Sequence, residues 1–246
     1  MVGTNKALGQ HWLKNRVILD EIASLAGEGG LCVEIGPGLG FLTSSLLKRF
    51  DRVVAVEYDK RLAENLPKSF PGKNLEVVNE DILKYDFEMT TESYVVVGNI
   101  PYYITSPIIE KVLTLKRLPR RVVLLIQKEV AERILSENET MLSLLVKNRA
   151  SVSAGPVVLA REFTPPPKVD SQVIVMEPHM SEVPEEVFDL IQRGFKAPRK
   201  KLIHNLAGLK SREELFDILK DIGVSPDVRP GDLKLMDWAR LYSLIR

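Results

Sequence analysis

A short polar and aromatic segment, Asn99-Ile100-Pro101-Tyr102, carries the side chains in this sequence that are best suited to chemistry. The asparagine offers one carbonyl acceptor and two amide donors. The isoleucine precedes proline, which favours extended backbone and holds its carbonyl outward. The tyrosine supplies a flat face on which a base could stack. Such a set could hold a planar amine between two acceptors and a ring. The alternative is a Gly-Asn-Pro turn without a chemical role.

The residues before this tetrad predict where in a fold it lies. Val95-Val96-Val97-Gly98 is an apolar, β-branched run without alternation, which is typical of a parallel strand buried on both faces. The tetrad then follows the carboxyl end of a strand, where open α/β sheets bind their ligands. Other ligand-binding residues are therefore expected at the ends of neighbouring strands.

A glycine-rich turn, Gly36-Pro37-Gly38-Leu39-Gly40, follows a predicted strand over residues 31–35 and leads into a predicted helix from Phe41. Strand, glycine-rich turn and helix form the first half of a nucleotide-binding βαβ unit. Gly36 and Gly38 have no Cβ, so the backbone there can come close to a ligand.

Two acidic residues follow the next predicted strands. Residues 53–56 form the second strand, and Glu57 follows it about 20 residues after the turn, where a ribose-binding carboxylate belongs. The third strand, residues 75–78, leads to Asp81 and Ile82. The carboxylate of Asp81 could accept a hydrogen bond from the amino group of adenine, and Ile82 could pack on the adenine ring.

Two cofactors fit this pattern, a nicotinamide dinucleotide and S-adenosylmethionine. The dinucleotide pattern is G-x-G-x-x-G, whereas this chain has G-x-G-x-G with Pro37 in the second position. A pyrophosphate needs free N–H groups at the start of the helix, and proline removes one. Glu34, just before the turn, suits a cationic ligand. These features favour S-adenosylmethionine.

The order of predicted elements divides the chain into two domains. Further strands are expected over residues 121–127, 151–159 and 171–176, with helices between them, so residues 1–180 form an α/β domain. After a linker at 177–184, the periodicity is helical to the end of the chain, so residues 181–246 form a small all-helical domain.

A proline-rich loop lies between the last two predicted strands. Pro165, Pro166 and Pro167 fix it in an extended form, so the ring of Phe163 is held in place. We expect Phe163 to lie near the tetrad as a second stacking face. The alternative is that this loop only links two strands.

Composition excludes several classes of protein. The chain has 246 residues, 45% of them hydrophobic and 27% charged, as expected of a globular protein. The single cysteine, Cys32, cannot form an internal disulfide and fits a reducing, cytoplasmic compartment. Three histidines and one cysteine do not supply a zinc site, so no metal is expected. Neither a signal peptide nor a membrane-spanning run is recognisable, so no membrane association is expected.

One basic segment stands out in a chain whose net charge is only +1. From Leu190 to Arg212 there is no acidic residue, and the basic cluster Arg199-Lys200-Lys201 lies near the middle. Local clustering of this kind can make a surface for RNA phosphates. The alternative is an ordinary solvated helix face.

Seven stretches resemble the ribosomal RNA adenine dimethyltransferase family. They are GQHWL from Gly9, EIGPGLGFLT from Glu34, VEYD from Val56, NEDIL from Asn79, NIPYYITSPI from Asn99, QKEVAERI from Gln127 and FTPPPKVDS from Phe163. The resemblance implies a class I, Rossmann-like methyltransferase sheet with one antiparallel strand at the edge, followed by the helical domain. It also implies S-adenosylmethionine as cofactor and transfer of methyl groups to adenosine N6.

The same resemblance assigns roles to particular residues. Asn99, Ile100, Pro101 and Tyr102 form the catalytic tetrad. The cofactor pocket is lined by His11, Leu13, Gly36, Glu57, Asp81 and Asn99. His11 and Leu13 would otherwise be taken as packing of the amino-terminal arm.

Several functions stay open within this resemblance. The tail PDVRPGDLKLMDWARLYSLI and GQHWL resemble the branch that dimethylates two adjacent adenosines near the 3′ end of small-subunit rRNA. The expected partners are then that rRNA and an immature small ribosomal subunit, with the enzyme acting as a monomer. The alternatives are the large-subunit branch that confers macrolide-type resistance and an assembly factor that acts mainly by binding. A small-molecule methyltransferase would explain neither the stiff loop of Phe163 nor the basic helical tail.

Overall fold

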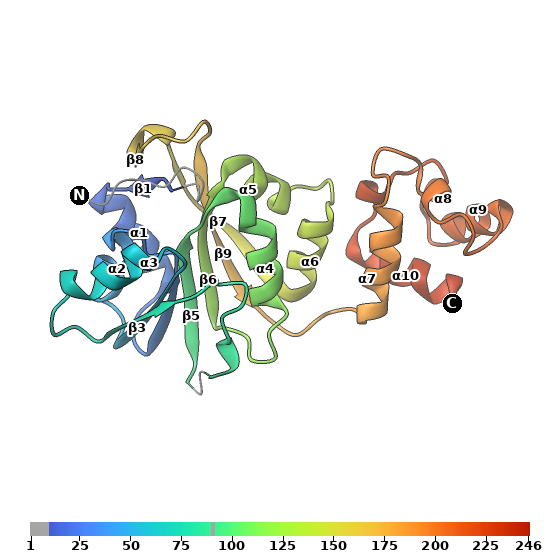
Figure 1. Ribbon diagram of the computed structural model, residues 1–246. Coiled ribbons are helices and arrows are strands. Elements are labelled where there is room, and N and C mark those ends of the chain that lie inside the picture. Colours follow the sequence, from blue (N-terminus) through green and yellow to red (C-terminus); the bar gives the residue numbers. More distant parts are fainter. Residues whose placement is uncertain (1–9, 90–91) are drawn as a thin grey trace. The chain divides into compact units, whose positions relative to one another are not determined.

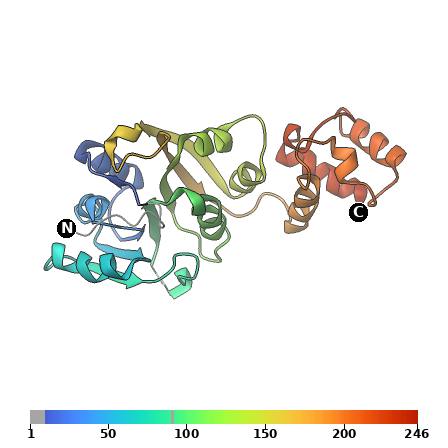
Figure 2. The same ribbon diagram turned by 45° about the horizontal axis from the view of Figure 1, so that its top comes forward.

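The structure is a computed structural model that describes residues 10–89 and 92–246. These residues form two compact units (Figures 1 and 2). The first unit comprises the described residues up to Glu132 together with Ala150–His179, and the second comprises Arg133–Arg149 together with Met180–Arg246. The predicted boundary at residue 180 therefore differs from this division mainly for residues 133–149. Gly9, where the GQHWL stretch begins, lies outside the described residues.

The first unit contains a seven-stranded sheet. Its strands are β2 (Leu31–Ile35), β3 (Arg52–Glu57), β4 (Leu75–Asn79), β5 (Tyr94–Asn99), β6 (Arg121–Gln127), β7 (Ala150–Val158) and β9 (Ser171–Pro178). Their order in the sheet is β4-β3-β2-β5-β6-β9-β7, parallel from β4 to β6. All seven strands predicted from the sequence are present.

The position of the antiparallel strand corrects one expectation. β9 runs antiparallel to both β6 and β7, but β7 and not β9 is the edge strand. Residues 159–170, between β7 and β9, contain no α-helix, and neighbouring strands joined without a helical crossover run antiparallel. β9 therefore returns between β6 and β7.

The helices of the first unit are α1 (Arg16–Ala26), α2 (Phe41–Leu46), α3 (Lys60–Asn65) and α4 (Thr105–Leu113), with short 3₁₀ segments η2 (Leu66–Ser69), η3 (Phe87–Met89), η4 (Tyr102–Ile104) and η5 (Ala160–Glu162). α5 (Lys128–Leu135) runs from the first unit into the second. The second unit contains α6 (Met141–Arg149), α7 (Glu185–Gly194), α8 (Leu202–Asn205), α9 (Arg212–Asp221), η6 (Pro230–Asp232) and α10 (Leu235–Ile245). No helix within the described ranges is both long and apolar enough to span a bilayer.

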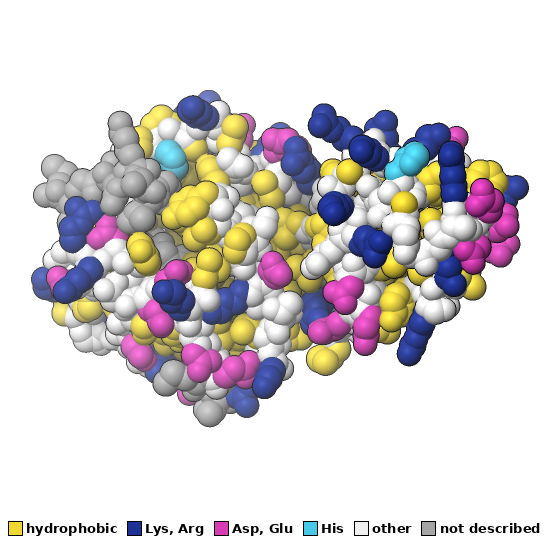
Figure 3. Space-filling model, turned by 45° about the vertical axis from the view of Figure 1, so that its right-hand side comes forward, with side chains coloured by type: hydrophobic (Ala, Val, Ile, Leu, Met, Phe, Trp, Pro, Cys, Tyr) yellow, Lys and Arg dark blue, Asp and Glu magenta, His cyan; other side chains and the backbone are white. Residues whose placement is uncertain are grey.

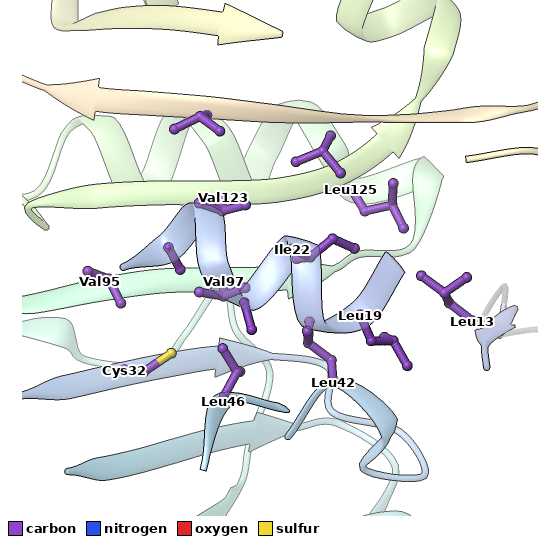
Figure 4. Close-up of a cluster of buried hydrophobic side chains, with 14 of the residues drawn as sticks. Leu13, Leu19, Ile22, Cys32, Leu42, Leu46, Val95, Val97, Val123 and Leu125 are labelled. Atoms are coloured by element: carbon purple, nitrogen blue, oxygen red, sulfur yellow. The ribbon is translucent and has the colours of Figure 1, made fainter. Parts of the chain in front are cut away.

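The central strands are buried on both faces because their sequences are mostly apolar, with Glu34 of β2 as a buried exception. Every residue of β2 is buried, as are the first five residues of β5. Val95 and Val97 of β5 belong to the core between the sheet and helices α1 and α2, and Val96 points to the other face because side chains alternate along a strand. Figure 4 shows this core, with Leu13 beside Leu19 at one end.

A two-stranded ribbon holds the amino-terminal arm against the proline-rich loop. β1 (Trp12–Leu13) pairs antiparallel with β8 (Phe163–Thr164), so that Leu13 lies opposite Phe163. The side chain of Asn15 then accepts a hydrogen bond from the main-chain N–H of Val17, 3.1 Å away, and caps α1. The residues just before α1 are thereby tied to residues far along the chain.

The second unit has its own core around Trp238, whose side chain is fully buried. Residues 133–149 belong to it through Glu139, a buried carboxylate whose Oε1 lies 3.7 Å from Nζ of Lys234. The main-chain N–H of Glu139 also donates to the carbonyl oxygen of Gly231, 2.8 Å away. These contacts join segments far apart in sequence, which explains why periodicity did not predict the grouping.

Candidate active site

A cavity of about 350 Å³ opens at the carboxyl ends of β2, β3, β4 and β5. This is the edge at which a doubly wound sheet binds ligands. The predicted site residues that line it are His11, Leu13, Gly36, Gly38, Glu57, Asp81, Ile82, Asn99, Ile100, Pro101 and Tyr102. Every residue that the sequence assigned to the cofactor pocket or the tetrad is therefore at one cavity, although their roles stay predictions.

Asn99 is the last residue of β5, and its amide group is oriented by the amino-terminal arm. Its Nδ2 donates to the main-chain oxygen of His11 at 3.2 Å. This leaves Oδ1 as the end of the amide that can accept a hydrogen bond from a ligand. Ile100 is buried, and Pro101 follows it with a φ of −59°. The tetrad thus combines a directed acceptor with a fixed backbone.

Two residues from distant segments hold the ring of Tyr102. Its hydroxyl forms a hydrogen bond of 2.7 Å with Oγ of Ser171, at the start of β9. The ring of His11 lies nearly parallel to it, with 6.2 Å between centroids and 18° between planes, while Nδ1 of His11 is 2.7 Å from the carbonyl oxygen of Pro165. Burial raises the pKa of Tyr102, so the phenol stays neutral at physiological pH.

The glycine-rich turn takes backbone conformations that favour glycine. Gly36, Gly38 and Gly40 have φ values of +63°, +58° and +82°. A Cβ on Gly40 would lie 2.7 Å from the side chain of Leu66. A Cβ on Gly36 would meet no atom within 4 Å, so there the backbone faces open space into which a ligand can come close.

Glu57 is held firmly at the end of β3. Its Oε2 accepts from the main-chain N–H of Gly38 at 3.0 Å, and its Oε1 accepts from that of Asp59 at 2.8 Å. Each oxygen keeps a second lone pair, so the carboxylate can still accept hydrogen bonds from two ribose hydroxyls. Asp81, after β4, accepts from the main-chain N–H of Leu83 at 3.0 Å.

Pro37 does not exclude a pyrophosphate in the way that the sequence suggested. α2 begins at Phe41 with Gly40 as its N-cap, so Pro37 lies before the helix and removes none of its N–H donors. The charge of the cavity makes the distinction instead. Among the described residues that line it there are four acidic residues, Glu34, Glu57, Glu80 and Asp81, and no lysine or arginine. This donor set fits the cationic S-adenosylmethionine and disfavours a pyrophosphate.

Glu34 is the least satisfied of these carboxyl groups. Its residue is only 1% exposed, and its Oε2 has no hydrogen-bond partner within the described part of the chain. Burial is the main cause that raises the pKa of Glu34 to about 8, with a smaller contribution from the negative charge of Glu57 and an opposing effect of hydrogen bonds from Thr43. The sequence placed Glu34 beside a cation but did not indicate that it is buried.

Phe163 corrects another expectation. Its side chain is 3% exposed and belongs to the hydrophobic core with Leu13, and it is not among the described residues that line the cavity. Pairing of β8 with β1 turns the ring into the core, so it offers no stacking face. Lining residues that sequence reasoning left out of the site include Gln10, Trp12, Tyr58, Glu80 and Tyr103. Most of them are close in sequence to predicted site residues, and this proximity could have indicated that they line the same cavity.

The basic cluster Arg199-Lys200-Lys201 lies in the second unit, between α7 and α8. Arg199, Lys200 and Lys201 are exposed, and Figure 3 shows Lys and Arg side chains grouped along the upper side of this unit. Lys201 forms an ion pair with Asp227 at 2.7 Å, so its charge is partly neutralised. Arg199 and Lys200 are therefore the stronger candidates for phosphate contacts. The described residues contain no group of three or more potential ligands that could hold a metal ion.

Comparisons with known sequences cover the whole chain. The family described as "Ribosomal RNA adenine dimethylase" matches residues 1–246. A protein of Nostoc sp. named "Ribosomal RNA small subunit methyltransferase A" is 37% identical, over 100% of this chain and 99% of that protein. A protein of the same name from Gloeobacter violaceus is 38% identical, over 97% of this chain and 92% of that protein.

Solved structures of two proteins are also similar to this chain. A dimethyladenosine transferase from Plasmodium falciparum has a TM-score of 0.80 at 29% identity, over 94% of this chain and 96% of that one. The 23S rRNA methyltransferase ErmE has a TM-score of 0.77 at 26% identity, over 95% of this chain and 99% of that one. These likenesses confirm the predicted methyltransferase fold.

Replacing Glu34 by glutamine should change how stability depends on pH in the cofactor-free protein. The carboxyl group keeps its proton in the folded state up to about pH 8, whereas in the unfolded chain it loses the proton near its ordinary value of 4.5. Raising the pH through this window therefore favours unfolding, by up to about 1.4 kcal/mol per pH unit from this group. Glu34→Gln carries no proton to lose.

Urea unfolding at about pH 5.5 and about pH 7.5 measures the difference. Wild type should lose more stability than Glu34→Gln between these two conditions. The contribution of Glu57, whose pKa is also raised by burial, is present in both proteins and cancels in the comparison. Equal losses would show that Glu34 is ionised in the folded state.

Proposed function

We propose that this chain, which belongs to the ribosomal RNA adenine dimethylase family, dimethylates N6 of two adjacent adenosines near the 3′ end of small-subunit rRNA. The observation that carries this proposal is the arrangement at the cavity. The Oδ1 acceptor of Asn99 adjoins a pocket lined by carboxylates and suited to a cationic methyl donor. The small-subunit substrate is supported by relatives of that name at 37% and 38% identity, against 26% for the large-subunit enzyme.

The enzyme depends on S-adenosylmethionine, and we expect different cavity residues to bind different parts of the cofactor. Glu57 would accept hydrogen bonds from the ribose hydroxyls, and Asp81 would accept one from the amino group of adenine. Ile82 would pack on the adenine ring. The turn at Gly36 and Gly38 would let the backbone come close to the cofactor. When bound, the cofactor supplies an electrophilic methyl group on a positively charged sulfur.

The tetrad would prepare the target nitrogen. The lone pair of adenine N6 is delocalised into the ring, so N6 is a poor nucleophile. If Oδ1 of Asn99 and the carbonyl oxygen of Ile100 accept hydrogen bonds from its two N–H groups, N6 is drawn towards a pyramidal geometry. The lone pair then becomes available for attack, and the product cation loses one proton to solvent. Catalysis rests on positioning and electrostatics and needs no general base.

The target base must leave its stack to reach this site. Tyr102 would support it, because the ring is half-buried beside the tetrad and is fixed by Ser171 and His11. After the first transfer only one N–H remains, so the methylated nitrogen must rotate before the second transfer. Phe163 has no part in this proposal because it lies in the core.

The second unit would bind the ribosomal particle. Its segment from Leu190 to Arg212 has basic side chains and no acidic ones, and phosphate contacts position a protein without reading sequence. We take the partner to be an immature small ribosomal subunit in the cytoplasm, bound by one copy of the enzyme.

Methyl transfer to purified subunits tests the substrate directly. With labelled S-adenosylmethionine, unmodified small subunits should be labelled at two neighbouring adenosines near the 3′ end of their rRNA, and large subunits should not. Mapping of the label to large-subunit rRNA would instead assign the chain to the resistance branch. Saturable binding of small subunits without any transfer would leave only the assembly role.

Asn99→Ala tests the chemistry. It deletes one of the two acceptors that prepare N6, so the rate of transfer at saturating cofactor should fall by on the order of 100-fold or more. Asp81→Ala is the matched contrast, because it should weaken cofactor binding by about 1–3 kcal/mol with a smaller loss of rate at saturation. Single-turnover rates and calorimetry separate the two effects. Near-normal turnover of Asn99→Ala would contradict the mechanism.

Replacing both Arg199 and Lys200 by alanine tests the docking segment. Subunit binding should weaken, and the slope of log affinity against log salt should become shallower by about two, because fewer counterions are released. Lys201→Ala should have a smaller effect, since Asp227 already pairs with Lys201. Replacing Lys68 and Lys73 of the first unit removes the same charge and serves as the control. Equal effects of the two double variants would mean that only net charge matters.

A further inference from the structure

Glu34 differs from the other carboxyl groups of the cavity because almost no hydrogen bond or positive charge would stabilise its ionised form. Glu57 accepts two main-chain N–H bonds and Asp81 accepts one. Glu34 lies inside β2, is 1% exposed, and lines the cavity with an Oε2 that no described residue pairs. A buried charge without a partner is so costly that such a group stays neutral instead. The free enzyme therefore holds a carboxylic acid at the wall of its cofactor pocket.

The groups that face this acid offer it no positive charge. Thr43 approaches from α2, Glu57 lies at the end of β3, and Asp81 and Glu80 follow β4. Asn99 lies at the end of β5, and His11 of the amino-terminal arm is the only described lining residue that can carry a positive charge. Its Nδ1 is 2.7 Å from the carbonyl oxygen of Pro165. A cation could therefore come to Glu34 from the ligand.

We propose that Glu34 is the counter-ion of a cationic group of the cofactor and that it releases its proton when the cofactor binds. This inference rests on the proposed function, since it takes S-adenosylmethionine as the ligand. The O–H bond of the acid breaks, the electron pair stays on the carboxylate, and the proton passes to the buffer. The new carboxylate then pairs with the sulfonium or with the ammonium group of the amino-acid moiety.

Titration calorimetry in two buffers with different heats of ionisation counts the released protons. At about pH 7, binding of S-adenosylmethionine should release close to one proton per site, because Glu34 is then mostly protonated in the free enzyme. Adenosine has no cationic group and should release none. S-adenosylhomocysteine keeps the ammonium but lacks the sulfonium. Release with it identifies the ammonium as the partner, and absence of release identifies the sulfonium.

The variant Glu34→Gln tests whether the released proton comes from Glu34. The amide is similar in shape to the neutral acid, so the fold should persist, but the release should disappear and affinity for S-adenosylmethionine should fall. Glu80→Gln is the matched control, because Glu80 lines the same cavity and is partly exposed. It should keep the proton release of wild type. Loss of release in both variants would contradict the assignment to Glu34.

The pH dependence of wild-type affinity gives a second measurement that needs no variant. Binding of S-adenosylmethionine should tighten by up to about tenfold per pH unit below about pH 8, and adenosine binding should change much less. Any dependence that Glu34→Gln retains comes from other groups of the cavity, such as Glu57, whose pKa is also raised by burial. Binding of S-adenosylmethionine without proton release, or equal release with adenosine, would overturn the inference alone. Failure of S-adenosylmethionine to bind at all would overturn the proposed function.

Discussion

The hydrogen bond from Nδ2 of Asn99 to the main-chain oxygen of His11 decides what the candidate active site can do. An amide side chain has a donor end and an acceptor end, and only the acceptor end can draw a hydrogen bond from an amino group. Because the arm occupies the donor end, the acceptor end is left for the ligand. The arm in turn is held by β1–β8 pairing and by contact of His11 with Pro165. Catalytic geometry at the end of β5 thus depends on residues outside the central sheet.

Charge gives the cavity its selectivity. Ligand sites at strand ends of this kind of sheet also serve dinucleotides, and their glycine-rich turns look much alike. Here the described lining has four acidic residues and no lysine or arginine, which disfavours a pyrophosphate. The same concentration of acid leaves Glu34 protonated, because nothing in the free enzyme compensates its charge. A cationic cofactor suits the acidic lining and also supplies the positive charge that Glu34 lacks.

The sequence predicted what depends on neighbouring residues and missed what depends on distant pairing. Apolar runs and the spacing of Glu57 and Asp81 after their strands sufficed to bring the cofactor residues to one edge of the sheet. Phe163 was misjudged because its burial follows from pairing with Leu13. The grouping of residues 133–149 with the C-terminal part follows from the ion pair of Glu139 with Lys234 and the hydrogen bond of Glu139 to Gly231. Neither relation leaves a periodic signal.

The order in which the chain is synthesised bears on the pairing of its arm with the proline-rich loop. His11 and Pro165 meet across 154 positions of sequence, and Ser171, which holds Tyr102, is made later still. The arm and the tetrad can contact each other earlier through Asn99 and His11, but the contacts with Pro165 and Ser171 cannot form until these late residues leave the ribosome. Contacts of such long range form slowly because loop closure must come first. The candidate active site is therefore completed only after most of the first unit has been synthesised.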